Sequence, residues 1–441
     1  MPLLPLNPPM CRSHLLLRGL FSIATLTLLA LLGVVLFEPG LPYVPTRVVP
    51  AAGSPLLQDI LRQSLEQTPT VATQVAVLQD GAAFYPNELA QIATARTSVH
   101  LEAFIFHRTR IGQRFLNVLV ERARAGVKVR VVVDAVGSLP TSDHFFDPLR
   151  AAGAQVVWYQ PFRWYTLKRW NNRTHRELLI IDGNTAWIGG AGIGAAWDSG
   201  TGTGTAALPA WRDLVVRVGG APARALDAVF AESWLEASGE ILLAPATPPA
   251  AVPDADSAPT AMVLGSTPTG GRATRARLLF ALMVASARQQ LIIDSPYFVP
   301  DPAMRRALTD AARRGVRVTV ITPGAHNNHL IARLASRRHY GELIASGVNI
   351  FEYQPGMIHT KLMLIDGIWS VVGSTNFDNR SMGLNNEVNL LLRNPALAAQ
   401  LQQTVAGYLS HSRQISLKDW ATRPLLERTM AWFGSVLERQ E

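Results

Sequence analysis

The chain has 441 residues, of which 48% are apolar and 17% are charged, and its formal net charge at pH 7 is +9. This composition excludes a largely disordered chain, and the length suggests two or three packed units. The single cysteine, Cys11, excludes an intrachain disulfide and a zinc site built from several cysteines. The positive charge favours an anionic partner, either nucleic acid or phospholipid headgroups.

An uncharged stretch rich in Leu, Ala and Val spans residues 19–37. A helix of that length is about 28 Å long, close to the roughly 30 Å hydrocarbon layer of a bilayer. Arg12 and Arg18 precede the stretch, so the positive-inside rule places residues 1–18 in the cytoplasm and the following chain across the membrane. A cleaved secretory signal is the alternative, but its apolar region usually has only about 7–15 residues. We therefore predict a retained single-pass transmembrane anchor.

From residue 70 onward, short β-branched runs alternate with Ala-, Leu- and Arg-rich helical stretches, which predicts an α/β fold. Three segments recur in the same order about 190 residues later: 121–133 as 310–322, 149–161 as 343–355, and 175–183 as 359–367. A solenoid repeats every 20–50 residues, so this spacing predicts a duplicated domain instead. We expect a first repeat at 70–243, a Pro-rich extended linker at 244–260 and a second repeat at 261–441. The tail, residues 418–441, has apolar side chains at helical spacing, and we expect it to pack against the second repeat rather than a membrane.

The second repeat contains side chains suited to phosphoryl chemistry. His359 and Lys361 lie two residues apart in the apolar segment 358–365, which predicts a strand with both side chains on one face. Imidazole can act as a nucleophile or proton donor, and a lysine ammonium group neutralises phosphate oxygens. Asp366-Gly367 ends the segment with a hairpin signal, and the small residues of Gly373–Asp378 follow.

This arrangement resembles the signature of the phospholipase D superfamily, His-x-Lys-x4-Asp followed by Gly-Ser-x-Asn. The matching residues of the second repeat are His359, Lys361, Asp366, Gly373, Ser374 and Asn376. Within the superfamily the chain is most similar to bacterial cardiolipin synthases, through residues 100–106, 134–138, 295–300 and 376–381. The resemblance covers about residues 70–430 and implies two phospholipase D-like α/β/α repeats in a pseudo-twofold bilobal domain, preceded by one transmembrane helix.

The resemblance also implies an activity and its partners. Two half-sites meet at one active site, where one histidine attacks phosphorus to form a phosphohistidine and the other protonates the leaving alcohol. The implied product is cardiolipin made from phosphatidylglycerol, with no metal and no other cofactor. The expected partners are phospholipid substrates and the membrane surface, not nucleic acid. The expected location is the bacterial inner membrane, with the catalytic domain on the extracytoplasmic side.

Acidic residues complete the expected site. By the resemblance, an acid downstream of each motif hydrogen-bonds the histidine of that same motif. This pairs Glu387 with His359, and Asp213 with His175. Which histidine attacks, the second lipid substrate and the oligomeric state stay open at this point.

The remaining motif residues have other expected roles. Ser374 and Asn376 are predicted to contact substrate, together with the two downstream acids. The signature aspartates, Asp182 and Asp366, each precede a glycine. They are either catalytic groups or turn formers, and we favour the turn-forming role because Asp-Gly is a strong turn signal.

The first repeat departs from the signature. Glu177 occupies the lysine position, and Gly192 stands where the asparagine is expected. A carboxylate about 4 Å from a phosphodiester costs about 1 kcal/mol in water and about 4 kcal/mol at a partly buried site. Three interpretations remain: Glu177 pairs with Lys361 or an arginine, it binds or deprotonates the acceptor hydroxyl, or this half is inactive. The corresponding alternative functions are a phospholipase D that hydrolyses phospholipid to phosphatidic acid, and a lipid-binding pseudoenzyme.

Residues 162–170, just before the first motif, interleave aromatic and basic side chains. This composition suits the headgroup layer of a membrane, where Trp and Tyr are amphipathic and Lys and Arg meet phosphate. Single-stranded nucleic acid and an ordinary loop are the alternatives.

Overall fold

The computed structural model describes residues 18–30, 41–164, 171–198, 209–243, 259–268 and 273–436. The chain separates into two units, Met1–Leu41 and Pro42–Glu441, which are treated separately. In the first unit, residues 18–30 form an exposed helix, while residues 31–37 of the predicted anchor lie outside the described residues. None of the helices in the described ranges has both the length and the hydropathy needed to cross a bilayer. The anchor at 19–37 therefore stays a prediction.

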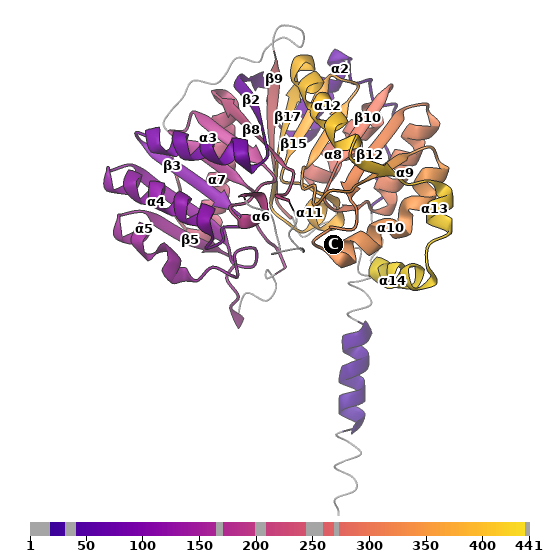
Figure 1. Ribbon diagram of the computed structural model, residues 1–441, viewed down its shortest axis with the longest axis horizontal. Coiled ribbons are helices and arrows are strands. Elements are labelled where there is room, and N and C mark those ends of the chain that lie inside the picture. Colours follow the sequence, from indigo (N-terminus) through magenta and orange to yellow (C-terminus); the bar gives the residue numbers. More distant parts are fainter. Residues whose placement is uncertain are drawn as a thin grey trace, which may run out of the picture. The chain divides into compact units, whose positions relative to one another are not determined.

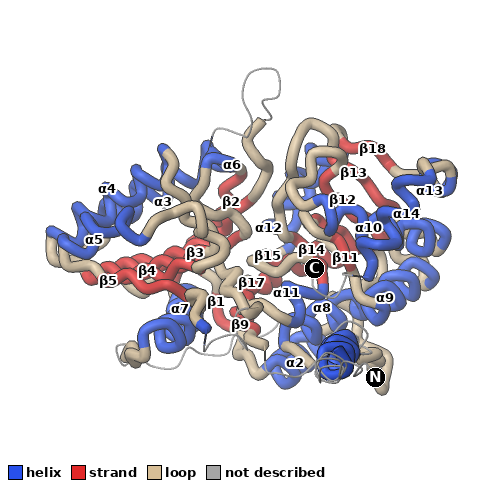
Figure 2. Tube along the Cα trace, turned by 90° about the horizontal axis from the view of Figure 1, so that it is seen from below, coloured by secondary structure: helices blue, strands red, loops and turns tan. Residues whose placement is uncertain are grey.

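The first repeat forms a seven-stranded mixed sheet in the order β2-β8-β7-β6-β3-β4-β5. Its strands are β2 (Thr73–Gln79), β3 (Ser98–Ala103), β4 (Lys128–Asp134), β5 (Gln155–Tyr159), β6 (Leu178–Ile181), β7 (Thr185–Gly189) and β8 (Leu214–Gly219). Its helices are α3 (Gly81–Thr94), α4 (Arg110–Arg124), the 3-10 turn η1 (Asp143–Phe146), α5 (Asp147–Ala151), α6 (Ala195–Asp198) and α7 (Ala221–Ser238). Figure 2 shows α3, α4 and α5 on one face of this sheet and α7 on the other.

The second repeat forms a nine-stranded sheet in the order β1-β9-β17-β15-β14-β10-β12-β13-β18, with β11 and β16 paired separately. Its strands are β1 (Thr70–Val71), β9 (Thr260–Ser266), β10 (Gln290–Asp294), β11 (Phe298–Val299), β12 (Arg317–Pro323), β13 (Asn349–Tyr353), β14 (Leu362–Ile365), β15 (Trp369–Gly373), β16 (Phe377–Asp378), β17 (Glu387–Arg393) and β18 (Ser412–Gln414). Its helices are α2 (Pro55–Leu65), α8 (Arg275–Ser286), α9 (Pro302–Arg313), α10 (Leu330–Ala345), α11 (Asn379–Gly383), α12 (Pro395–Leu409), α13 (Leu417–Ala421) and α14 (Leu425–Val436). Figure 1 shows the two repeats next to one another.

The two sheets share one topology, which confirms the predicted α/β duplication. The order β2-β8-β7-β6-β3-β4-β5 matches β9-β17-β15-β14-β10-β12-β13 strand for strand. The last three strands of this shared order, β3-β4-β5 and β10-β12-β13, pair in parallel, and the other pairs are antiparallel. The parallel strands end at one edge of each sheet, where connecting loops gather and binding sites commonly form.

The repeat boundaries differ from those predicted. Strand β1 pairs with β9 of the second sheet, and α2 buries Leu57 and Leu61 in the core of the second repeat. The chain therefore contributes to the second repeat before it enters the first sheet at Thr73. Thr260, expected to end the linker, already belongs to β9, and residues 244–258 lie outside the described residues.

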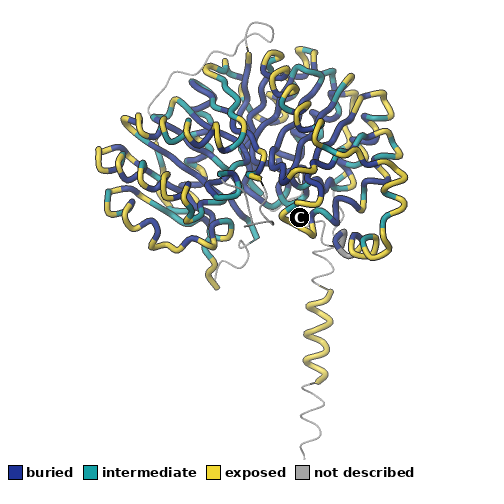
Figure 3. The backbone as a smooth tube through the Cα atoms, in the orientation of Figure 1, coloured by how far each residue is buried: buried dark blue, intermediate teal, exposed yellow. Residues whose placement is uncertain are grey.

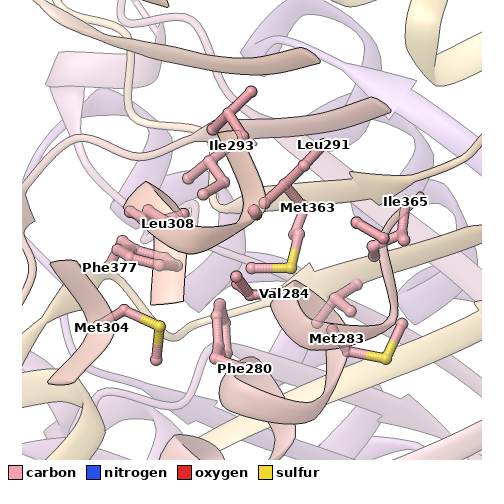
Figure 4. Packing of buried hydrophobic residues seen from close by; sticks show 14 of the residues in the cluster. Phe280, Met283, Val284, Leu291, Ile293, Met304, Leu308, Met363, Ile365 and Phe377 are labelled. Atoms are coloured by element: carbon pink, nitrogen blue, oxygen red, sulfur yellow. The ribbon is translucent and has the colours of Figure 1, made fainter. Parts of the chain in front are cut away.

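Apolar layers on both faces of each sheet hold the repeats together. Figure 4 shows part of the outer layer of the second repeat, where Phe280 and Met283 of α8 lie near Leu291 of β10 and Met363 of β14. A central layer combines the inward faces of both sheets with α7 and α12. Because both faces are covered, strands such as Leu178–Ile181 are continuous apolar runs.

The C-terminal helix packs against the second repeat, as predicted. Helix α14 lies on α10, with Ala431 fully buried and Glu427 hydrogen-bonded to Arg337 at 2.7 Å. Two of its apolar side chains, Leu425 and Leu426, are 75% and 72% exposed.

Candidate active site

The two signature histidines each lie three residues before the start of corresponding strands, His175 before β6 and His359 before β14. The strand predicted over 358–365 is therefore shorter than expected. Its first residues bind the other repeat instead, since the His359 backbone N donates to Arg212 O at 2.7 Å. In the same way, the His175 backbone N donates to Asn386 O at 2.9 Å. Each histidine is thus attached to the opposite repeat by its own backbone.

The carboxylates that bind these histidines also come from the opposite repeat. His175 Nδ1 lies 3.0 Å from Glu387 Oε1, and His359 Nδ1 lies 3.0 Å from Asp213 Oδ2. The predicted pairing of Glu387 with His359 and of Asp213 with His175 is therefore wrong. The physical reason is the pair of backbone contacts above, which place the residue before each acid against the opposite histidine. Each half of the site depends on a carboxylate from the other half.

Both acids are fully buried and are themselves held by a donor. Trp197 Nε1 donates to Asp213 Oδ2 at 3.0 Å, and Ser374 Oγ donates to Glu387 Oε2. Ser374, predicted to contact substrate, therefore positions the acid that orients His175. A carboxylate at Nδ1 holds the ring in place and leaves Nε2 as the nitrogen available for chemistry.

Lys361 lies against the His359 ring, as the motif predicted. Its Nζ donates to the His359 backbone oxygen at 2.9 Å and lies 2.8 Å from Nδ1 and 3.3 Å from Nε2 of the ring. Burial, followed by the Lys361 charge and opposed by Asp213, lowers the pKa of His359 to about 4, and positive charge on His175 adds to the effect. His359 is therefore neutral at physiological pH, and it lies close enough to His175 for a charge on that residue to lower its pKa.

A pH profile tests this state of His359. We expect the acid limb of the first chemical step to lie near pH 4 rather than near 6.5, since His359 stays unprotonated until the pH approaches its own lowered pKa. The measurement is single-turnover release of an activated leaving group from a phosphatidyl ester between pH 4 and 8. An acid limb between pH 6 and 7 would contradict the lowered pKa of His359.

Aromatic rings surround both histidines and were not predicted as site residues. Phe104 contacts His175 edge-on with ring centroids 5.1 Å apart, and Trp211 stacks on His359 at 5.2 Å. Tyr297 reaches His359 from the second repeat at 6.3 Å. The signal was present in the sequence, because these residues lie in or beside the segments that carried the resemblance.

The signature aspartates lie in turns. Asp182 accepts hydrogen bonds from the backbone amides of residues 96–98, and Asp366 accepts them from residues 288–290. Both aspartates have a φ of +51° and precede a glycine that also has a positive φ. Each one lies seven positions after its histidine, about 23 Å along an extended chain. This is the geometry of the turn-forming role that we favoured.

Asn376 follows β15 in the second half-site and is almost fully buried. Within the described ranges its side-chain oxygen has no hydrogen-bond partner. A buried amide oxygen in this state is suited to a ligand hydroxyl, so the substrate-binding role of Asn376 stays a prediction. The same ranges contain no group of three His, Cys, Asp or Glu side chains that could hold a metal ion.

Glu177 does not form the ion pair with Lys361 that we considered, among the residues that the structure describes. Its Oε1 accepts a hydrogen bond from the Ile105 backbone N at 3.2 Å, beside a cavity of about 20 Å³ that Glu88 and Glu102 also line. Burial raises the pKa of Glu177 well above its usual range, and Glu102 adds to the effect. This direction favours the neutral acid form of the carboxyl group, and the Ile105 amide and the charge of Lys361 oppose it.

The two departures from the signature fit one another sterically. A Cβ at Gly192 would lie 2.7 Å from Ile105 Cβ and 3.0 Å from Glu177 Oε1, so asparagine cannot be added there without displacing them. A Cβ at Gly190 would lie 2.4 Å from Lys361 Cδ. The glycines of the first repeat thus make room for Glu177 and for the lysine that extends from the second repeat.

Replacing Glu177 with glutamine tests its charge state. We expect Glu177→Gln to change the rate of phosphatidyl transfer by less than about threefold, because an amide resembles a protonated carboxyl group in shape. Glu177→Lys should lower the rate by more than about tenfold, because a second ammonium group would lie near Lys361. Initial rates on lipid vesicles provide the measurement. A loss of more than about tenfold in Glu177→Gln would show that an ionised carboxylate is needed.

Comparison with known proteins agrees with the duplicated site. One family profile matches residues 89–196 and 281–408, and it is described as cardiolipin synthase, phospholipase D-like domain. The cardiolipin synthase of Geobacillus kaustophilus is 33% identical over 362 residues, which are 81% of this chain and 70% of that protein. Cardiolipin synthase A of Pseudomonas putida is 36% identical over 349 residues, 78% of this chain and 70% of that protein.

A solved structure supports the fold. The phosphatidylserine synthase of Haemophilus influenzae aligns with a TM-score of 0.69 over 87% of this chain and all of that chain. At 14% identity this likeness concerns the fold and not the reaction. The family match covers more than half of the chain and includes both histidine motifs. The chain therefore belongs to the cardiolipin synthase family of proteins with phospholipase D-like domains.

Proposed function

We propose that this protein is a phosphatidyltransferase that makes cardiolipin from phosphatidylglycerol through a phosphohistidine on His359. The observation that carries the proposal is the crossed pair of histidine–carboxylate contacts, which brings two oriented imidazoles to one site beside Lys361. The names of its relatives support the substrate class, since both of those compared above are cardiolipin synthases.

The reaction proceeds in two balanced steps. Nε2 of neutral His359 attacks the phosphorus of the donor lipid, the bond to glycerol breaks, and His175 gives its proton to the leaving glycerol oxygen. His175 then takes the proton of a hydroxyl on a second phosphatidylglycerol. That oxygen bonds to phosphorus as the bond to His359 breaks, so two phosphatidylglycerols yield one cardiolipin and one glycerol. Lys361 neutralises the phosphate oxygens throughout.

A membrane surface is the proposed working environment of the site. Four apolar side chains are more than half exposed in the loops after β4 and β5, which end at the same sheet edge: Val136, Leu139, Phe162 and Trp164. Phe104, beside His175, follows β3 at that edge. Helix α14 adds exposed leucines, and Figure 3 shows it on the same lower side as the exposed tip of the first repeat. Exposed apolar clusters of this kind are typical of membrane contact.

The proposed location is the bacterial inner membrane, with the catalytic repeats on the extracytoplasmic side. Support comes from the sequence, where two arginines precede the apolar stretch. Protease protection of spheroplasts and inverted vesicles tests it. Cleavage of the repeats in spheroplasts is the expected result, and protection there would reverse the orientation.

The test of function is purified full-length protein incubated with phosphatidylglycerol vesicles, followed by separation of the lipid products. We expect cardiolipin and glycerol in equal amounts. Phosphatidic acid without cardiolipin would identify a hydrolytic phospholipase D instead. Vesicle binding without any turnover would identify a lipid-binding pseudoenzyme.

A further inference from the structure

A separate cavity of about 710 Å³ lies in the second repeat, between residues 42–49 and the helices α8 and α9. None of the residues that line it belongs to the histidine motifs. Its volume falls within the range of about 300–1,000 Å³ that holds small-molecule ligands. The cavity is therefore large enough for a ligand of its own.

One wall of the cavity is apolar and made of small side chains. Ala281 and Ala285 are one turn apart on α8, and Ala303 and Ala307 are one turn apart on the neighbouring α9. Met304 adds further apolar surface. Alanines at facing positions of two packed helices leave a channel that larger side chains would fill.

The rim of the cavity carries excess positive charge. Five arginines line it against two aspartates: Arg47, Arg277, Arg288, Arg306 and Arg314 against Asp301 and Asp310. Arg277 is buried and paired with Asp301 at 3.3 Å. The Arg288 guanidinium instead donates to backbone oxygens, from Nη1 to those of Ala285 at 2.8 Å and Ala287 at 3.0 Å and from Nη2 to that of Val49. Among the described residues, no carboxylate forms an ion pair with it.

Two of these arginines repel each other. Burial and the charge of Arg288 lower the pKa of Arg314, and Asp310 offsets the effect only in part. Both arginines line the cavity. Guanidinium groups that repel one another are stabilised by an anion bound between them, since arginine binds phosphate oxygens in a bidentate manner. The cavity thus offers an anion site at its rim and an apolar channel beside it.

We propose that this cavity binds an anionic phospholipid, with its phosphate at Arg288 and Arg314 and an acyl chain along the alanines of α8 and α9. The bound lipid lies outside the reacting site, so it is held without being consumed. This inference goes beyond the proposed function and does not depend on turnover. The protein thus binds one lipid in this cavity and converts other lipids at the histidine site.

Photo-crosslinking tests the proposal. Full-length protein is mixed with phosphatidylcholine vesicles containing a trace of phosphatidylglycerol with a photoreactive acyl chain, or of phosphatidylcholine with the same chain. We expect the acidic lipid to label peptides from residues 275–288 and 302–314 at least about fivefold more strongly than the zwitterionic lipid. Equal labelling by both lipids, or no label in these peptides, would overturn the proposal.

Variants locate the binding groups. Arg288→Ser with Arg314→Ser should remove the preference for the acidic lipid, whereas Arg313→Ser, an exposed neighbour outside the cavity, should keep it. Ala307→Trp should block labelling by filling the channel. A preference that survives in the double arginine variant would contradict the anion site. Complete displacement of the label by 1 mM glycerol phosphate would mean that a soluble phosphate ester, not a lipid, is the ligand.

Cardiolipin formation is measured on the same samples. Selective labelling without turnover would reject the proposed function and leave the lipid site intact. Turnover without selective labelling would reject the lipid site and leave the proposed function intact.

Discussion

Replacing His359 with alanine should lower the rate of cardiolipin formation by at least about 10⁴-fold, because no covalent phosphatidyl intermediate can form without the nucleophile. His175→Ala should also abolish steady-state turnover on phosphatidylglycerol, since the glycerol oxygen must be protonated as it leaves. The steady-state rate therefore does not tell the two histidines apart.

An activated substrate separates their roles. A phosphatidyl ester of p-nitrophenol needs no proton on its leaving group, so His175→Ala should still release one equivalent of nitrophenol in a burst. His359→Ala should give no burst. Acid-quenched protein from the first variant should carry a phosphatidyl group on the peptide that contains His359. A burst in His359→Ala and none in His175→Ala would reverse the assignment of nucleophile and proton donor.

The second large effect concerns Asp213 and Glu387, the carboxylates that each contact the histidine of the opposite repeat. Asp213→Asn and Glu387→Gln should each lower kcat by about 10²–10⁴-fold, because each removes the charge that orients an imidazole. With the activated substrate, Asp213→Asn should slow the burst, since Asp213 contacts His359, the proposed nucleophile. Glu387→Gln should leave the burst and slow only the second step, since Glu387 contacts His175.

A matched control comes from the first repeat. Asp227 also binds a histidine, His100, at 2.6 Å, but lies away from the site. Asp227→Asn should therefore keep both the burst and turnover within about twofold of the wild type. If Asp213→Asn spared the burst while Glu387→Gln slowed it, each acid would serve its own repeat, and the crossed arrangement would be wrong in solution.

The crossed contacts explain how two repeats of unequal sequence make one site. The first repeat supplies His175 and Asp213, and the second supplies His359, Lys361 and Glu387. Each acid contacts the histidine of the other repeat, and neither contact involves Glu177 or Gly192. The departures from the signature at these two positions therefore leave both histidine–carboxylate pairs intact. The burial of these pairs between the repeats also couples active-site geometry to the packing of the central apolar layer.

Sequence was sufficient for the duplicated α/β fold and for the identity of the principal side chains. Three recurring segments indicated the duplication, since apolar periodicity and glycine-capped helices are local properties of the chain. The spacing His-x-Lys placed His359 and Lys361 together because residues two apart in an extended chain share a face. The Asp-Gly steps at 182 and 366 likewise predicted turns from local backbone preference.

Only the tertiary structure decided which residues of one repeat contact the histidine, or join the sheet, of the other repeat. The family resemblance implied Glu387 as the partner of His359, but backbone contacts between the repeats bring it to His175. The place of strand β1 in the second sheet was also decided by the tertiary structure. Its pairing with β9 joins residues some 190 positions apart, so it depends on which strand edge of the sheet is available rather than on local sequence. The raised pKa of Glu177 likewise follows from burial, to which Glu102 adds, a property of the packed interior and not of the motif.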